Sequence, residues 1–290
     1  MLVRTFHVGA LIAVILALPA NKPLRAAQVS APRYGVIAAD RKQLVAFDPQ
    51  GRLLWSIPNF GPVHRIQQLP NGHLLTQNGW TRIVELNPAR EVVWEYDAAT
   101  ANGNRGKKVE VHAFQRLDDG RTMIVENGVG RIIEVDAAGE IVHALNFRVA
   151  QPNPHHDVRQ AYKLPTGNYL VCHEADGRVT EYSPAGDVVW DYQVPLFDRP
   201  HAGGHGPDAW GNQVFNARRL ENSHTLTATG NGHSVIEVTP AGEVVWQLHQ
   251  HDLPGITLAW TTTLEVLPNG NILLGNCHAG REHPQLIELT

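Results

Sequence analysis

The stretch Gly242-Glu-Val-Val-Trp246 decides the fold, because closely similar stretches recur along the chain. Its copies are Gly51-Arg-Leu-Leu-Trp55, Arg90-Glu-Val-Val-Trp94, Gly139-Glu-Ile-Val-His143 and Gly186-Asp-Val-Val-Trp190. Successive copies begin 39, 49, 47 and 56 residues apart. A period in this range is typical of proteins that stack one supersecondary unit per repeat.

A second pattern alternates with the first, and together they divide each repeat into four short strands. It is a tight turn followed by an apolar run, with copies at Pro70-Asn-Gly72, Asp118-Asp-Gly120, Pro165-Thr-Gly167, Glu221-Asn-Ser223 and Pro268-Asn-Gly270. In the second repeat the expected strands are residues 64–69, 73–77, 82–86 and 91–96. Asn-Gly-type turns favour hairpins, and no helical periodicity competes with this pattern. Four strands per repeat predict the blade of a β-propeller.

Counting strands predicts the number of blades. Repeats two to five are complete, the first begins at its second strand and the last ends at its third, which gives 22 strands. Two more would complete six four-stranded blades, and these two would be consecutive if the chain continued past Thr290. We therefore predict an all-β fold, a six-bladed β-propeller of four-stranded antiparallel blades whose ring closure is incomplete at the C-terminus. The alternative is a ring with two three-stranded blades.

The N-terminal residues 1–27 have the pattern of a signal peptide. Arg4 precedes an apolar run over residues 6–18, and Ala20 and Ala27 offer small residues for cleavage. The run is shorter than the ~20 residues of a spanning helix, so we expect no membrane span after its removal. Residues 28–290 then form a single β-propeller domain that is exported, either periplasmic or secreted. An uncleaved anchor is the alternative.

Charge and cysteine content exclude several classes of protein. The 24 Lys and Arg residues against 28 Asp and Glu residues give a net charge of −4 without any block of like charge, so nucleic acid is not the expected partner. Cys172 and Cys277 are the two cysteines, which excludes a disulfide framework and any CxxC motif. A single disulfide between them stays open.

The histidines gather on one predicted face. In an antiparallel blade, the loops after the second and fourth strands emerge together, and these are the long loops of this chain. Eleven of the 16 histidines fall on them: His64, His112, His155, His156, His173, His201, His205, His233, His251, His278 and His283. Loops on a rigid β scaffold commonly carry function, and histidine is a versatile acid, base or ligand.

Candidate site residues follow from this placement. The candidate catalytic residues are His112, His173, His205, His278 and Arg159, and the candidate ligand-binding residues are His64, His156, Asp157, His201 and Trp260. Hydrogen bonding within the fold is the structural alternative for His64 and His112. Pro154-His-His-Asp157 suggests a divalent metal as a further open alternative. Neighbouring residues of a strand point to opposite sides, so at most one of these two histidines is expected to be a ligand.

The repeat resembles a known family. Residues 235–246, Val-Ile-Glu-Val-Thr-Pro-Ala-Gly-Glu-Val-Val-Trp, are similar to the repeat of bacterial quinoprotein-like (PQQ-like) β-propellers, and most of all to that of the arylsulfotransferase propeller. The resemblance spans residues 34–290. Quinoprotein dehydrogenases have eight blades, PQQ, Ca²⁺ and usually an adjacent cysteine pair, so PQQ is not expected here and no cofactor is predicted. Arylsulfotransferases are longer and add an N-terminal domain.

Two functions are consistent with these observations. The first is an exported binding module that takes a small molecule, glycan or protein at its histidine-rich face. The alternative is an enzyme using that face. The resemblance implies an arylsulfotransferase-like transferase with a channel histidine as nucleophile or base and a cationic neighbour such as Arg159. A lyase or hydrolase with a histidine base is the other form of this alternative.

Overall fold

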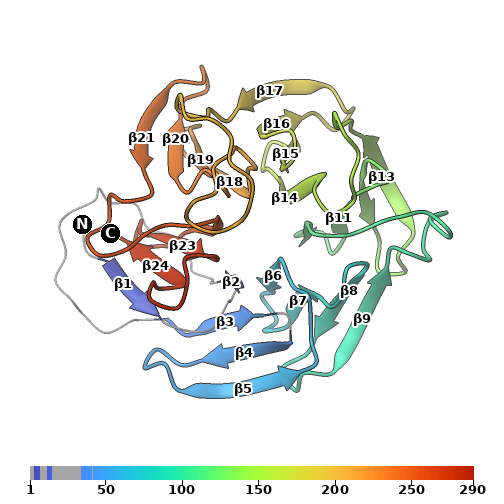
Figure 1. The fold of residues 1–290 in the computed structure, drawn as a ribbon. Coiled ribbons are helices and arrows are strands. Elements are labelled where there is room, and N and C mark those ends of the chain that lie inside the picture. Colours follow the sequence, from blue (N-terminus) through green and yellow to red (C-terminus); the bar gives the residue numbers. More distant parts are fainter. Residues whose placement is uncertain (1–2, 7–11, 15–33, 41) are drawn as a thin grey trace. The chain divides into compact units, whose positions relative to one another are not determined.

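The computed structural model describes residues 3–6, 12–14, 34–40 and 42–290, and it consists of β-strands and turns. The strands form six four-stranded antiparallel sheets, each made of strands that neighbour one another along the chain except where the N-terminal strands join (Figure 1). No helix occurs among these residues. The prediction of an all-β fold with six blades of a β-propeller is confirmed.

The strand boundaries agree closely with the sequence pattern. The first three sheets are β2 (Ile12–Val14), β3 (Val36–Ala39), β4 (Gln43–Phe47) and β5 (Leu53–Pro58); β6 (Ile66–Gln68), β7 (Leu74–Gln77), β8 (Arg82–Leu86) and β9 (Val92–Asp97); and β10 (Phe114–Arg116), β11 (Thr122–Glu126), β12 (Arg131–Val135) and β13 (Ile141–Asn146). The last three are β14 (Val158–Lys163), β15 (Tyr169–His173), β16 (Arg178–Tyr182) and β17 (Val188–Gln193); β18 (Asn216–Arg219), β19 (Thr225–Ala228), β20 (Val235–Val238) and β21 (Val244–Leu248); and β22 (Thr261–Val266), β23 (Ile272–Asn276), β24 (Leu286–Leu289) and β1 (Val3–Phe6).

The chain divides into two compact units. One is Gly61–Val194, with the three sheets from β6 to β17, and the other combines Met1–Phe60 with Pro195–Thr290. Each unit has its own apolar cores between neighbouring sheets. Phe114, Ile124 and Ile133 are fully buried in one core of the first unit, and Leu258, Leu264 and Ile287 in one core of the second.

The two strands missing from the sequence count come from the N-terminal segment. β1 pairs antiparallel with β24, with Val3 opposite Leu289, and β2 pairs antiparallel with β3, with Ile12 opposite Ala39. The first and last sheets are therefore four-stranded, and the fourth strand of the last sheet is β1 where we had expected chain beyond Thr290. Most of the predicted signal peptide lies outside the described residues, but β1 and β2 fall within it.

The fourth strand of each complete repeat contains a β-bulge that explains the recurring Val-Val-Trp. Glu85 lies opposite Trp94, but the next residue of β8 lies opposite Val92, so Val93 is an extra residue. The extra residue breaks the alternation of the strand, and Val92 and Val93 are both exposed, at 51% and 52%. The same shift occurs in the sheets of β5, β13, β17 and β21.

A glutamate of the third strand holds the turn between the first and second strands. The glutamate carboxylate lies 2.5–2.7 Å from a side-chain nitrogen of the residue that follows the turn, with which it forms a hydrogen bond or an ion pair. The five pairs are Glu85 with His73, Glu134 with Arg121, Glu181 with Asn168, Glu237 with His224, and Glu288 with Asn271. His73 and His224 therefore have the same structural role as an arginine or an asparagine elsewhere.

The tryptophan of the repeat links neighbouring sheets, as expected. Trp94 Nε1 donates a hydrogen bond of 3.0 Å to the carbonyl oxygen of Ala137, which lies in the turn between β12 and β13. The Arg116 guanidinium lies 5.0 Å from the Trp94 ring. In the third sheet His143 takes the place of tryptophan and stacks on Tyr169 at 6.0 Å.

We expect Trp94→Phe to lower the free energy of unfolding by about 1–2 kcal/mol, because it keeps one aromatic ring but removes a hydrogen bond and part of the indole surface. Chemical denaturation measures the change. Val93→Ala is the control, because this side chain is exposed and its loss should change stability by less than about 0.5 kcal/mol. Equal effects of both substitutions would contradict the linking role of Trp94.

We also expect the protein recovered after export to begin after Ala20 or Ala27, and so to lack β1 and β2. Intact-mass measurement on the exported protein tests this. A mass that includes residues 1–27, together with slow amide exchange in β24, would instead show that β1 stays paired in the mature chain.

Candidate functional site

The unit Gly61–Val194 gathers three of the predicted loop histidines at one place. We call it the histidine cluster and define it as His64, His112 and His155 with Glu110 and Trp80. The His64 and His112 ring centroids are 4.6 Å apart, and those of His112 and His155 are 5.4 Å apart. The cluster combines loops from the sheets of β6–β9, β10–β13 and β14–β17.

Local strand geometry places Glu110 and His112 on the same side of the chain. Glu110 forms an isolated antiparallel bridge with Asn127, so the segment is extended. In extended backbone, residues two apart share a face, and the residue between them points the other way. Val111 is accordingly fully buried in an apolar core, and its amide donates to the Trp80 carbonyl at 2.8 Å. This bond brings the backbone of Trp80 alongside the Glu110–His112 segment.

The turn that carries His155 is fixed by Asp157. One carboxylate oxygen of Asp157 accepts from the Asn153 amide at 2.6 Å, and the other accepts from the Gly128 amide at 2.7 Å. Gly128 has φ +78°, and a Cβ there would lie 2.6 Å from Cγ of Pro154, so only glycine permits this approach. Asp157, predicted as a ligand-binding residue, thus holds the turn in place. Burial, the largest influence on it, raises the pKa of this carboxyl.

Glu110 is the centre of the cluster, because one of its oxygens contacts two histidines. Glu110 Oε2 is 2.8 Å from His112 Nε2 and 2.9 Å from His155 Nδ1. A carboxylate only accepts, so both ring nitrogens carry protons in this arrangement. His112 Nδ1 is buried and has no hydrogen-bond partner among the described residues.

A buried ion pair lies beneath the cluster. Arg159 and Glu174 are 5% and 0% exposed, and Arg159 Nε donates to Glu174 Oε2 at 2.6 Å. The same guanidinium contacts His64 Nε2 at 3.2 Å and donates to the His155 carbonyl at 2.9 Å. His156 Nδ1 lies 3.3 Å from Glu174, so it belongs to this pair and not to the Glu110 group. Arg159 therefore positions histidines from two different loops.

Trp80 forms the exposed side of the cluster. Its side chain is 40% exposed, and its ring lies 5.4 Å from that of His64 and 4.8 Å from that of His155. His155 is itself 39% exposed on its side chain, whereas His112 is fully buried. The site is thus open at Trp80 and His155 and closed at His112.

Electrostatics favour a neutral or cationic ligand at the cluster. Burial, followed by the charge of Arg159, lowers the pKa of both His64 and His112 well below the ordinary histidine value. Glu110, whose side chain is 22% exposed, contributes a negative charge beside His155 on the open side of the cluster.

A second group of predicted residues lies in the other unit. The His205 ring packs on Trp260 at 4.4 Å and on His278 at 5.1 Å. Trp260 has φ +55° and its amide donates to His233 Nδ1 at 2.9 Å, which holds this unusual backbone in place. His201 is exposed, next to the bridge between Ala202 and Trp210.

His173 stands apart from both groups. It is the last residue of β15, its Nε2 is 2.9 Å from the Tyr182 hydroxyl, and its ring packs on Phe147 at 5.4 Å. Burial, followed by the charge of Arg178, lowers its pKa to about 4. This environment gives His173 a role in packing.

The low pKa of His173 predicts a pH dependence of stability. The folded state resists the proton that the unfolded chain binds below about pH 6.5, so stability is fully present above that pH and is lost as pH falls towards 4. We expect the wild type to lose about 1–3 kcal/mol more than His173→Gln between pH 7 and pH 4. Denaturation across this range measures it. Parallel pH profiles of the two proteins would contradict the prediction.

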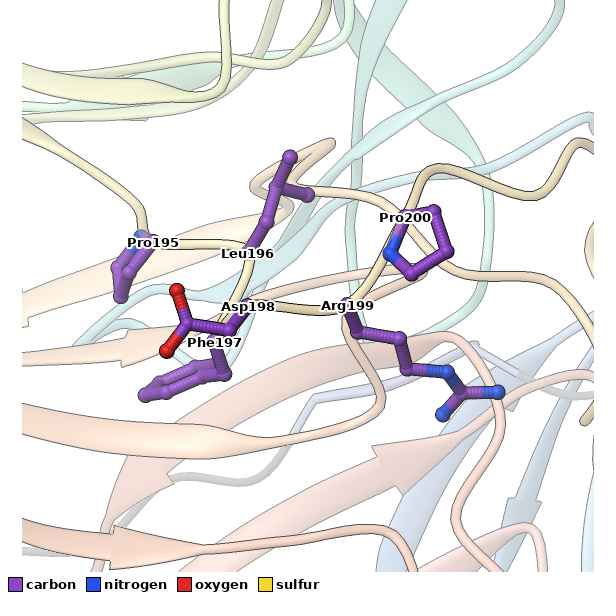
Figure 2. Close-up of a pocket in the computed structure, with 6 residues that line it drawn as sticks. All are labelled: Pro195, Leu196, Phe197, Asp198, Arg199 and Pro200. Atoms are coloured by element: carbon purple, nitrogen blue, oxygen red, sulfur yellow. The ribbon is translucent and has the colours of Figure 1, made fainter.

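A hollow of about 760 Å³ lies at the segment Pro195–Pro200 (Figure 2). The Arg199 guanidinium packs 4.3 Å from the Trp210 ring and the Phe197 ring packs 5.1 Å from that of His249. Since one loop alone lines this hollow and no histidine or carboxylate pair converges on it, we do not assign it a chemical function.

Sequence reasoning named His64, His112 and Arg159 but missed Glu110, His155 and Trp80. The spacing Glu110-x-His112 was a usable signal, since residues two apart share a face of extended chain. His155 was weighed against His156 in the expectation that at most one is a ligand. The structure turns His155 to Glu110 and His156 to Glu174.

Comparisons with solved structures agree with the fold. A protein of unknown function from Bacteroides caccae is 20% identical with a TM-score of 0.71, over 88% of this chain and 89% of that one. Virginiamycin B lyase from Staphylococcus aureus is 10% identical with a TM-score of 0.57, over 86% and 76%. BamB from Moraxella catarrhalis is 13% identical with a TM-score of 0.50, over 88% and 79%. No match was found among curated protein sequences.

The family comparison supports the PQQ-like repeat and gives no support to the finer likeness to arylsulfotransferases. Within the part of the chain that the structure describes, no helix has the length and apolar character to cross a membrane. The model of one family matches residues 40–259, about three quarters of the sequence. The chain therefore belongs to the PQQ_2 family, which is described as outer membrane protein assembly factor BamB.

Proposed function

We propose that this protein is an exported binding module that takes a small molecule at the histidine cluster. The observation that carries the proposal is the open aromatic surface of Trp80, 40% exposed, directly beside the Glu110 carboxylate and its two histidines. An exposed indole next to fixed polar groups is typical of sites that bind a planar ring and orient its substituents.

The polar groups of the cluster suggest the kind of ligand. Glu110 accepts hydrogen bonds, and buried His112 Nδ1 lacks a partner among the described residues. Glu110, whose side chain is 22% exposed, is the acceptor that a bound molecule can reach. A planar ring with hydroxyl or amino substituents would stack on Trp80 and donate to Glu110. This is the small-molecule form of the proposal.

The arylsulfotransferase-like alternative is less well supported by the geometry. Sulfate transfer needs cationic groups at the sulfuryl oxygens. Arg159, expected to supply that charge, is 5% exposed and is bonded to Glu174 and His64. The Glu110 carboxylate on the open side of the cluster disfavours an anionic substrate. We therefore retain binding as the proposed function.

We expect catechol to bind the wild-type protein and 1,2-dimethoxybenzene, which has no donors, to bind more weakly. Trp80→Ala should weaken catechol binding by about 3- to 10-fold, because the stacking surface is lost, and Trp80→Phe should restore part of it. Saturation-transfer NMR titrations measure these affinities. His224→Gln is the control, since His224 pairs with Glu237 in the other unit. Equal affinity of wild type and Trp80→Ala would contradict the proposed site.

A further inference from the structure

We propose that Glu110, His112 and His155 bind a divalent transition-metal ion. The inference rests on the proposed function, because it concerns the same cluster and assigns a metal ion to its polar side. One carboxylate oxygen and one ring nitrogen from each histidine lie within 4.8 Å of one another. Two imidazoles and a carboxylate are a recurring ligand set for zinc and for ferrous iron.

The distances are close to those that a metal requires. Zinc binds nitrogen and oxygen at about 2.0–2.2 Å, so tetrahedral ligand atoms lie roughly 3.3 Å apart. Glu110 Oε2 is 2.8 Å from His112 Nε2 and 2.9 Å from His155 Nδ1. These two contacts would lengthen by about 0.4–0.5 Å to reach that spacing, and the two ring nitrogens lie within 4.8 Å of each other. Each ring binds a metal through an unprotonated nitrogen, so the proton that it donates to Glu110 would move to its other nitrogen, Nδ1 of His112 and Nε2 of His155.

The surroundings hold the three side chains in place. Glu110 is fixed by its backbone bridge to Asn127, and the turn of His155 by Asp157 and the Arg159 guanidinium. Ligands on backbone segments that are held this way lose little conformational freedom when a metal binds. His64 Nε2 is occupied by Arg159, so His64 lines the site and is not one of the ligands that we assign.

The exposure of two of the three ligands indicates a site that is open on one side. Glu110 and His155 side chains are 22% and 39% exposed, and Trp80 borders them. An ion held by three protein ligands beside such an opening keeps a position for water or for a donor atom of a bound molecule. The Glu110 carboxylate supplies a negative charge to a bound cation. The hydroxyl group of a ring stacked on Trp80 would lie near that position.

Titration of the metal-free full-length protein with Co²⁺ and Zn²⁺ tests the proposal. After dialysis against EDTA, we expect one equivalent of Co²⁺ to bind with visible absorption bands of a four- or five-coordinate ion, and Zn²⁺ to displace it. Glu110→Gln and His155→Gln should each weaken binding by roughly 100-fold or more, since even outer-shell changes cost 10- to 100-fold. Both side chains are partly exposed, so these variants are expected to fold, which thermal unfolding confirms.

His224→Gln is the matched control, because it removes a similarly short histidine–glutamate contact, 2.6 Å, in which the glutamate contacts one histidine instead of two. It should leave Co²⁺ affinity unchanged. Absence of Co²⁺ and Zn²⁺ binding, or equal binding by wild type and Glu110→Gln, would overturn the metal site. Catechol binding by the metal-free protein would in that case leave the proposed function standing. Metal binding without catechol binding would overturn the proposed function alone.

Discussion

The glutamate on the third strand of five of the six sheets is the contact on which the regularity of the fold depends. The second and third strands are buried on nearly every residue, as in β11, where all five residues are buried. The register between these two strands must be fixed, because a slip by one residue would expose an apolar face. In these five sheets, a short contact between the glutamate and the first residue after the turn that precedes the second strand fixes that register.

The contact with the third-strand glutamate also distinguishes histidines with a structural role from those of the candidate site. The donor to the glutamate is histidine at His73 and His224, arginine at Arg121 and asparagine at Asn168. The position needs a donor, and imidazole is one of several that serve. The histidine cluster is different, because His112 and His155 share one carboxylate that belongs to no turn. The number of histidines in the sequence therefore overstates the size of the site.

Much of the fold could be predicted from the sequence, because strand and turn signals are local. The expected strand 82–86 is β8 without change, and 91–96 differs from β9 by one residue at each end. β1 and β2 were not predicted as strands. No repeat motif marks them, and β1 pairs with β24 from the opposite end of the chain. An apolar run near Arg4 predicts a signal peptide equally well.

The site was predictable only in part, for a related reason. The alternation that places Glu110 and His112 together is visible in the sequence, and both lie in one segment. The approach of His155 depends on Asp157 reaching the Gly128 amide from another loop. Trp80 joins the cluster through its backbone carbonyl, a contact that no side-chain pattern reveals. Such contacts depend on how the sheets pack against one another, and the local sequence pattern does not predict that packing.

The bulge at the valine pair has a consequence for self-association. Outer strands such as β9 and β17 present adjacent exposed valines, and an apolar strand edge invites pairing with another copy of the chain. The extra residue, Val93 in β9, interrupts the regular spacing of backbone donors and acceptors at that edge. A strand from another copy of the chain could not form a continuous series of backbone hydrogen bonds along this edge. The irregularity that turns Trp94 inward thus also protects the protein from edge-to-edge aggregation.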